Sequence, residues 1–209
     1  MGNAEIPTQQ SVEVARCTVL PEFLALEELA ALTDYCNQRE ADFRQSQVVS
    51  RDYVVNEQFR RSRVLLDTGK FHDIISERVR SHFPWILRAL RHPHFDISRI
   101  ESQLTASNDG DFFRMHNDST HAHAPSREIT YVYFCHREPR QFKGGELLIY
   151  DSYLERNEVM PGPVRKRIIP EQNSIALFES SCLHEVLPVR CPSESFSDSR
   201  FTLNGWLHC

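Results

Sequence analysis

The chain of 209 residues contains few glycines and no long hydrophobic run. No apolar stretch approaches the roughly 20 residues that a membrane-spanning helix needs, so we expect no membrane partner. The N-terminal residues 1–7 lack the basic and apolar regions of a secretory signal. These absences predict a cytoplasmic protein.

The six cysteines are scattered, with neither a C-x-x-C pair nor the spacing of a zinc motif. We therefore expect free thiols. An excess of basic residues is also missing. The net charge is -5, which gives no support to non-specific nucleic-acid binding, so we expect no nucleic-acid partner. No pattern in the sequence predicts the oligomeric state.

The residues that are present suit one globular unit. Hydrophobic residues make up 40% of the chain and charged residues 25%, which are ordinary proportions for a folded domain. Residues 1–11 are polar, and we expect a disordered tail there. We expect one domain over residues 12–209, with helical support to about residue 95 and a β-rich core over about 96–209.

Two helical patterns occupy the first half. Pro21 opens a segment whose apolar residues recur at helical spacing, and a second such segment begins at Phe71. Pro84 interrupts that pattern, which predicts a separate helix over 85–90. Between the two patterns, short β-rich pieces flank the cluster Arg60-Arg61-Ser62-Arg63.

The second half contains short β-rich runs separated by turns. A block of helices followed by many strands predicts a mainly β protein, a sandwich or barrel with supporting helices on one side. The runs are 100–105, 112–116, 129–135, 146–150, 175–178, 186–189 and 201–207.

A candidate metal site lies in the run that ends in His116-Asn117-Asp118. Side chains two apart on a strand point to the same side, so His116 and Asp118 can project together into a barrel. His184 follows the clean strand 175–178 and precedes another β-rich run, where it can face the first two ligands. Two histidines and one carboxylate form the facial triad of non-haem iron oxygenases, which leaves positions open for cosubstrate and O2.

An H-x-D pattern alone is weak, but an arginine opens the last β-rich run. Alternation places Arg200, Thr202, Asn204 and Trp206 on one face of that strand. A guanidinium can hold a carboxylate with paired charge-assisted hydrogen bonds, the threonine or asparagine can add another, and the indole can form an apolar wall. This face suits a small dicarboxylate. The alternative is an arginine in a salt bridge at the rim of the barrel.

With an H-x-D pattern, a later histidine and then an arginine that opens a β-rich run, the chain resembles the 2-oxoglutarate- and Fe(II)-dependent oxygenases, in particular the prolyl 4-hydroxylase-like branch. The resemblance covers most of the sequence and implies a double-stranded β-helix, or jelly roll. It further implies that His116, Asp118 and His184 bind Fe(II) and that Arg200 binds the C5 carboxylate of 2-oxoglutarate. It is carried by the segments Pro21-Glu22-Phe23-Leu24, Gly110 to Asp118, Arg127 to Phe134, Gly144-Gly145-Glu146-Leu147, His184-Glu185-Val186 and Arg200-Phe201-Thr202.

The chain departs from the family pattern near the cosubstrate residues. The interval from His184 to Arg200 is long, and residues 191–199 look inserted; Arg190 is nearer, but no β-rich run follows it. The family often carries a cosubstrate-binding tyrosine where this chain has Phe134. Tyr131 or Tyr133 can substitute for it.

The resemblance implies a 2-oxoglutarate- and O2-dependent hydroxylase that acts on an unactivated C–H bond and releases succinate and CO2, with ascorbate as a stimulant. Two substrates stay open: a prolyl residue of a protein, or an amino-acid-like small molecule. Arg60, Arg63, His121 and His123 are candidates for contact with substrate, although a solvated charge cluster is the alternative for the arginines. A different class is a metal-binding jelly roll or cupin-type protein without 2-oxoglutarate turnover.

Overall fold

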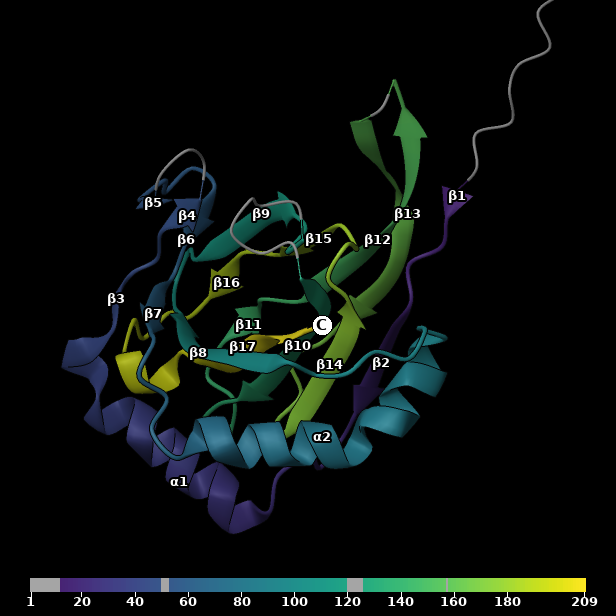
Figure 1. Cartoon of the computed structure of the whole chain (residues 1–209). Coiled ribbons are helices and arrows are strands. Elements are labelled where there is room, and N and C mark those ends of the chain that lie inside the picture. The colour runs from purple at the N-terminus through teal and green to yellow at the C-terminus, as the bar shows by residue number, and fades with distance from the viewer. Residues whose placement is uncertain (1–11, 50–52, 120–125, 157) are drawn as a thin grey trace, which may run out of the picture.

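The computed structural model describes residues 12–49, 53–119, 126–156 and 158–209, and two antiparallel sheets dominate it (Figure 1). The expected tail, residues 1–11, lies outside the described residues. The larger sheet has the strand order β2-β14-β10-β17-β8-β7-β3. Its strands are β2 (Cys17–Leu20), β14 (Ser174–Glu179), β10 (Arg127–Cys135), β17 (Arg200–His208), β8 (Arg99–Ser107), β7 (Arg63–Leu65) and β3 (Arg44–Gln45).

The second sheet has the order β1-β12-β15-β9-β6, and β13 pairs with β12 outside this path. Its strands are β1 (Val12–Glu13), β12 (Leu147–Glu155), β15 (His184–Val186), β9 (Phe112–His116), β6 (Arg60–Arg61) and β13 (Glu158–Ile168). Two short pairs complete the strands: β11 (Lys143–Gly144) with β16 (Val189–Arg190), and β4 (Val48–Val49) with β5 (Tyr53–Val54). Together the sheets form a jelly roll, which confirms the expected fold class.

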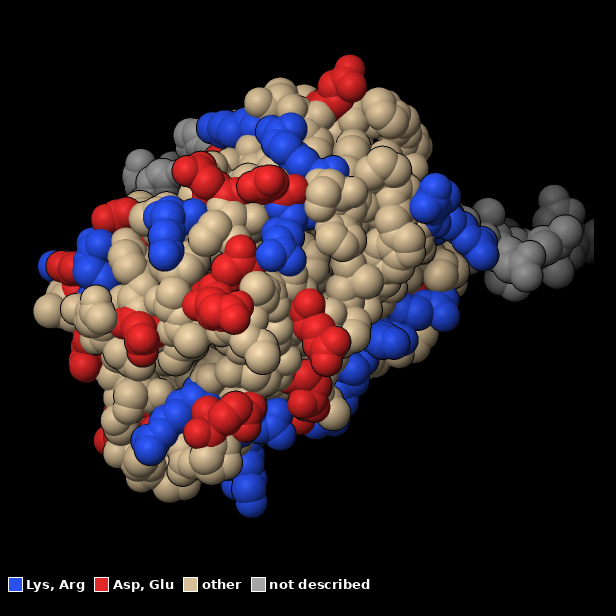
Figure 2. Space-filling view, turned by 90° about the horizontal axis from the view of Figure 1, so that it is seen from below, with Lys and Arg blue, Asp and Glu red and all other residues tan. Residues whose placement is uncertain are grey.

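Two helices, α1 (Leu26–Gln38) and α2 (Phe71–Leu90), lie along the outer side of the larger sheet (Figure 1). Each helix buries one apolar stripe, with Leu32 in α1 and Ile75 in α2 completely enclosed, because their apolar residues recur at helical spacing. The opposite face is polar, and Figure 2 shows acidic and basic side chains interspersed on this side of the molecule. Neither helix in the described part of the chain combines the length and apolar character needed to cross a membrane.

The predicted interruption at Pro84 is wrong, because α2 continues through it to Leu90. A proline inside a helix leaves the carbonyl four residues earlier without its hydrogen bond. Here that carbonyl belongs to Arg80, and both residues lie on the exposed face, where water can satisfy it. The six cysteines are free, as predicted.

The sequence predicted only the first strand of the hairpin that β12 and β13 form, because only that strand has a β-rich sequence. β13 contains Pro161 and Pro163 and a run of charged residues, and almost all of it is exposed. A strand at the edge of a sheet tolerates proline, since its outward N–H groups have no ladder partner. β12 is itself a largely buried strand of the second sheet, and only the outer part of the hairpin projects beyond the two sheets (Figure 1).

Candidate metal centre

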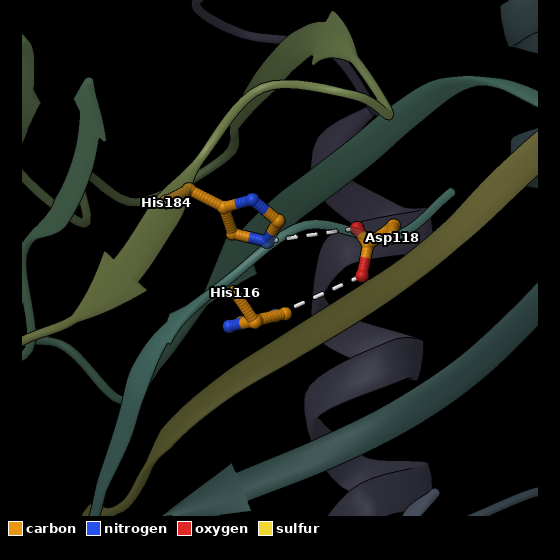
Figure 3. A group of neighbouring side chains, drawn as sticks. All are labelled: His116, Asp118 and His184. Atoms are coloured by element: carbon orange, nitrogen blue, oxygen red, sulfur yellow. Dashed lines mark ion pairs between the residues drawn. The ribbon is translucent and has the colours of Figure 1, made fainter. Parts of the chain in front are cut away.

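The structure brings His116, Asp118 and His184 together (Figure 3). His116 is the last residue of β9 and pairs in register with His184, the first residue of β15; Asp118 follows two residues beyond His116. His116 Nε2 lies 3.7 Å from Asp118 Oδ1, and His184 Nε2 lies 3.5 Å from Asp118 Oδ2. One ligand atom from each residue lies within 4.8 Å of the others, so the group can hold a metal ion.

Backbone and hydroxyl groups orient all three side chains. His116 Nδ1 lies 2.7 Å from the carbonyl oxygen of Arg114, and His184 Nδ1 lies 2.9 Å from that of Cys182. An Nδ1–H that donates to a carbonyl leaves Nε2 free as a metal ligand. Thr130 Oγ1 donates to Asp118 Oδ2 at 2.8 Å and so holds the carboxylate.

Electrostatics prepare the same three groups for a divalent cation. Burial, followed by the charge of His184, lowers the pKa of His116 to about 3, so this imidazole is neutral at pH 7. Burial raises the pKa of Asp118, but His184, His116 and the hydrogen bond from Thr130 act against it and together hold that pKa below its usual value. An ionised carboxylate and imidazole nitrogens make a donor set that suits Fe(II).

A cavity of about 1160 Å³ opens beside the three ligands, and Arg200, Thr202, Asn204 and Trp206 line it. These are the four residues of β17 that alternation placed on one face. Arg200 is only 3% exposed, and its Nε and Nη2 have no hydrogen-bond partner among the described residues. Burial lowers the pKa of Arg200 to about 10, so the guanidinium stays charged at pH 7. A buried cation with unused donors fits the carboxylate of a bound dicarboxylic acid.

Neighbouring side chains set the orientation of the other two polar groups on this face. The Asn204 side-chain oxygen accepts hydrogen bonds from Thr105 Oγ1 at 2.9 Å and from Thr202 Oγ1 at 3.3 Å. The amide N–H groups of Asn204 are therefore left for the cavity. Trp206 lies under the guanidinium of Arg127, whose Cζ is 3.6 Å from the centre of the indole ring.

Gly145 leaves the space that Arg200 needs, and Gly144 lets the same turn pack closely against the backbone of Pro188. A Cβ atom on Gly145 would lie 2.6 Å from Arg200 Cδ, and a Cβ atom on Gly144 would lie 2.2 Å from the carbonyl oxygen of Pro188. Gly145 also has a φ of +69°, which disfavours other residues. The sequence motif thus has a physical cause in the packing around the arginine.

We expect Gly145→Ala to weaken 2-oxoglutarate binding by about 10-fold and to lower the free energy of unfolding by about 1–3 kcal/mol, because the new methyl group displaces Arg200 and the backbone is strained. Gly110→Ala is the matched control, since Gly110 has a φ of +73° but its Cβ would make only ordinary contacts with Arg61. Calorimetric titration with 2-oxoglutarate and thermal unfolding measure the two effects. Equal loss of affinity in both variants would show that strain alone is responsible.

The expectation that Tyr131 or Tyr133 contacts the cosubstrate is not supported. Both side chains are fully buried in the core between the larger sheet and the helices. Tyr131 donates to the carbonyl oxygen of Glu101 at 3.0 Å, and Tyr133 donates to Asn173 Oδ1 at 2.8 Å. Alternation along β10 explains the placement, because Thr130 and Val132 line the cavity and the tyrosines point the other way.

Of the candidate substrate residues, the two arginines lie in different surroundings. Arg60 lines the cavity. Arg63 lies elsewhere, over the ring of Phe196 with its Cζ 4.4 Å from the ring centre. His121 and His123 lie outside the described residues.

The segment inserted before Arg200 forms part of the support for β17. The side-chain amide of Asn108 donates to the carbonyl oxygen of Ser195 at 2.8 Å and to Ser199 Oγ at 2.8 Å, while Phe196 packs on Phe201 with ring centres 5.1 Å apart. These contacts hold the start of β17. Sequence reasoning missed this role, as well as Thr130 and Gly145, because their signal is a contact between distant segments.

Comparison with known proteins gives independent support. The family model of the 2OG-Fe(II) oxygenase superfamily matches residues 102–208, which contain all three candidate ligands and Arg200. An uncharacterized PKHD-type hydroxylase from Synechocystis sp. is 44% identical over 152 residues, which are 72% of this chain and 50% of that protein. The match thus spans half the length of this curated relative.

Solved structures share the fold. A prolyl-4-hydroxylase from Pseudomonas putida aligns over 93% of this chain and 94% of its own, with a TM-score of 0.65 and 19% identity. A prolyl hydroxylase from Trichoplax adhaerens, in complex with a peptide fragment of the hypoxia inducible factor oxygen degradation domain, aligns over 92% and 83%, with a TM-score of 0.64 and 18% identity. With a prolyl-hydroxylase-like fold and a family match over half of its length, the chain belongs to the 2OG-Fe(II) oxygenase superfamily.

Proposed function

We propose that the protein is an Fe(II)- and 2-oxoglutarate-dependent dioxygenase that hydroxylates an unactivated C–H bond and releases succinate and CO2. One observation carries the proposal: a buried arginine with unused donors lines the same cavity as a His-Asp-His group. When bound, iron and 2-oxoglutarate supply the oxidation of the substrate by O2. The protein's residues bind, orient and shield the reactants.

Each residue has a defined task in this proposal. His116, Asp118 and His184 would hold Fe(II), and Arg200 would bind the C5 carboxylate of 2-oxoglutarate. Asn204 would add a hydrogen bond to that carboxylate, or Thr202 would do so by turning its hydroxyl hydrogen away from Asn204 Oδ1, and Trp206 would form a wall of the site. Apolar side chains that line the same cavity, Val132, Leu147, Leu183 and Val186, would limit the access of water to the metal.

Two substrate classes are compatible with this cavity: a prolyl residue of a protein, and an amino-acid-like small molecule. The first is supported by the fold shared with prolyl hydroxylases, one of which is bound to a peptide. The second is supported by the volume of the cavity, about 1160 Å³, which exceeds the needs of the cosubstrate alone.

The competing function is metal binding without 2-oxoglutarate turnover. Arg200 argues against it, because a metal-binding jelly roll or cupin-type protein gains nothing from a buried, unpartnered arginine beside the metal. Such a group is costly to bury unless a ligand completes its hydrogen bonds.

The test is succinate formation from 2-oxoglutarate by the purified protein with Fe(II), ascorbate and O2. We expect slow turnover without added substrate from the wild type and none from His184→Ala, which lacks one ligand. Succinate from both proteins would remove His184 from the site. If the wild type forms no succinate and binds no 2-oxoglutarate, the result favours metal binding without turnover as the function.

A further inference from the structure

Three arginines line the cavity, and two of them have a partner or an assigned task. Arg127 forms an ion pair with Glu101, with Nη2 2.6 Å from Oε2. Arg200 is assigned to 2-oxoglutarate by the proposed function. Arg60 is the third arginine, and no carboxylate of the described residues lies within ion-pair distance of it.

The neighbours of Arg60 show that its position is specific. Arg61 points to the other side of the strand, where its Nε lies 3.7 Å from Asp111 Oδ1. Arg63 lies 4.0 Å from Glu40 Oε1. Arg60 itself donates from Nε to Ser62 Oγ at 3.2 Å, which leaves the outer nitrogens of its guanidinium for the cavity. An arginine cluster in the sequence thus becomes two ion-paired arginines and one that faces the site.

Arg60 also lies close to the metal ligands. Its Cζ is 4.6 Å from the ring centre of Phe113, and this ring stacks on His116 with a centre-to-centre distance of 3.6 Å. The backbone fixes the arrangement, because β6 pairs with β9 and puts Arg60 opposite Phe113. Arg60 and the metal ligand His116 therefore both contact the ring of Phe113, so a group bound by Arg60 would lie close to the metal centre.

The charge of Arg60 persists at neutral pH. Burial lowers its pKa to about 10, and the negative charge of Asp118 partly opposes that shift. With iron bound, the carboxylate of Asp118 would serve the metal, and Arg60 would have no other acid nearby among the described residues. Arg60 is partly buried, and a guanidinium in this condition is complemented best by an anion that enters the cavity.

We propose that Arg60 binds a carboxylate group of the substrate and so holds the substrate beside the metal. This inference rests on the proposed function and names the substrate class: a molecule that carries a carboxylate within reach of the C–H bond to be oxidised. The carboxylate can belong to a free amino-acid-like acid or to an acidic side chain of a peptide, and the guanidinium would bind either one through the same pair of hydrogen bonds.

The test compares acids with their amides, which have the same shape and no charge. Protein saturated with Mn(II) and 2-oxoglutarate is titrated calorimetrically, so that Arg200 is already occupied and no turnover takes place. The small-molecule probes are N-acetyl-L-proline and N-acetyl-L-leucine with their amides. The peptide probes are the blocked tripeptides Glu-Pro-Ala and Gln-Pro-Ala. The proteins are the wild type, Arg60→Gln, and Arg61→Gln as the matched control outside the cavity.

We expect the wild type to bind at least one acid on the order of 10- to 100-fold more tightly than its amide. Arg60→Gln should lose this preference, whereas Arg61→Gln should keep it. A preference among the small acids identifies a free acid as the substrate class, and a preference only for the Glu peptide identifies an acidic peptide.

Two results would overturn the inference: no acid favoured over its amide by the wild type, or a preference that survives in Arg60→Gln. Binding of 2-oxoglutarate to the Mn(II)-loaded proteins is measured first. If the wild type binds none, the proposed function fails and this inference falls with it. If 2-oxoglutarate binds equally to all three proteins and the acid preference is missing, only the role of Arg60 is wrong.

Discussion

Asp118→Ala should weaken the binding of Fe(II) on the order of 1,000-fold or more and abolish succinate formation. Loss of an outer-shell partner already costs about 10- to 100-fold in metal affinity, and loss of a ligand costs more. Asp118 is also the anionic member of the group, so its removal leaves only imidazole nitrogens as ligands for a divalent cation. Its oxygens lie 3.7 Å from His116 Nε2 and 3.5 Å from His184 Nε2, and no other carboxylate of the described residues belongs to this group.

Anaerobic equilibrium dialysis with Fe(II) measures this loss. The matched control is Asp96→Ala, because Asp96 is exposed and does not line the cavity. Both apoproteins should still fold, as thermal unfolding checks, because Asp118 lies outside the hydrophobic core, although Asp118→Ala also loses the hydrogen bond from Thr130. Retention of wild-type affinity in Asp118→Ala would remove this residue from the metal site.

Arg200→Ala should weaken 2-oxoglutarate binding by roughly 100-fold or more, because removing one partner of a buried charged pair costs about 2–5 kcal/mol. Metal binding should be unchanged, since Arg200 touches none of the three ligands. The effect on the cosubstrate is therefore selective. The protein itself can gain stability from the change, because Nε and Nη2 of Arg200 are buried without a partner when no ligand is bound.

The control for this prediction is Arg190→Ala. Arg190 is exposed on β16 and does not line the cavity, although it is closer to His184 in the sequence. Calorimetric titration of the Mn(II)-loaded variants with 2-oxoglutarate distinguishes the two arginines. A larger loss in Arg190→Ala than in Arg200→Ala would mean that the wrong arginine has been assigned.

The placement of the candidate ligands could be predicted because it depends on local geometry. His116 and Asp118 are two residues apart at the end of a strand, and alternation directs them to the same side whatever surrounds them. The same rule placed Arg200, Thr202 and Asn204 on one face of β17, and the cavity lies on that face. The roles of these residues stay predictions until binding is measured.

Alternation does not by itself reveal which face of a buried strand points inward. Residues 129–135 of β10 are nearly all apolar, so hydrophobicity is equal on its two faces. Tyr131 and Tyr133 were expected near the cosubstrate as substitutes for a tyrosine at the position of Phe134, and the apolar pattern of β10 gave no sign that both point toward the helices instead. The sequence likewise does not show which arginine of the cluster faces the cavity. Arg60 lies in β6, which pairs with β9, and lines the cavity, whereas Arg63 lies in β7, which pairs with β8, and does not.

The sequence by itself determined the β-rich core, the spacing of the metal ligands and the arginine that opens the last strand, because strand periodicity and side-chain chemistry act over a few residues. Only the tertiary structure decided which residues share the cavity. The clearance that Gly145 leaves for Arg200, the hydrogen bond from Thr130 to Asp118, and the missing acid partner of Arg60 each depend on segments far apart in the chain. Such contacts follow from packing, which no short stretch of sequence encodes.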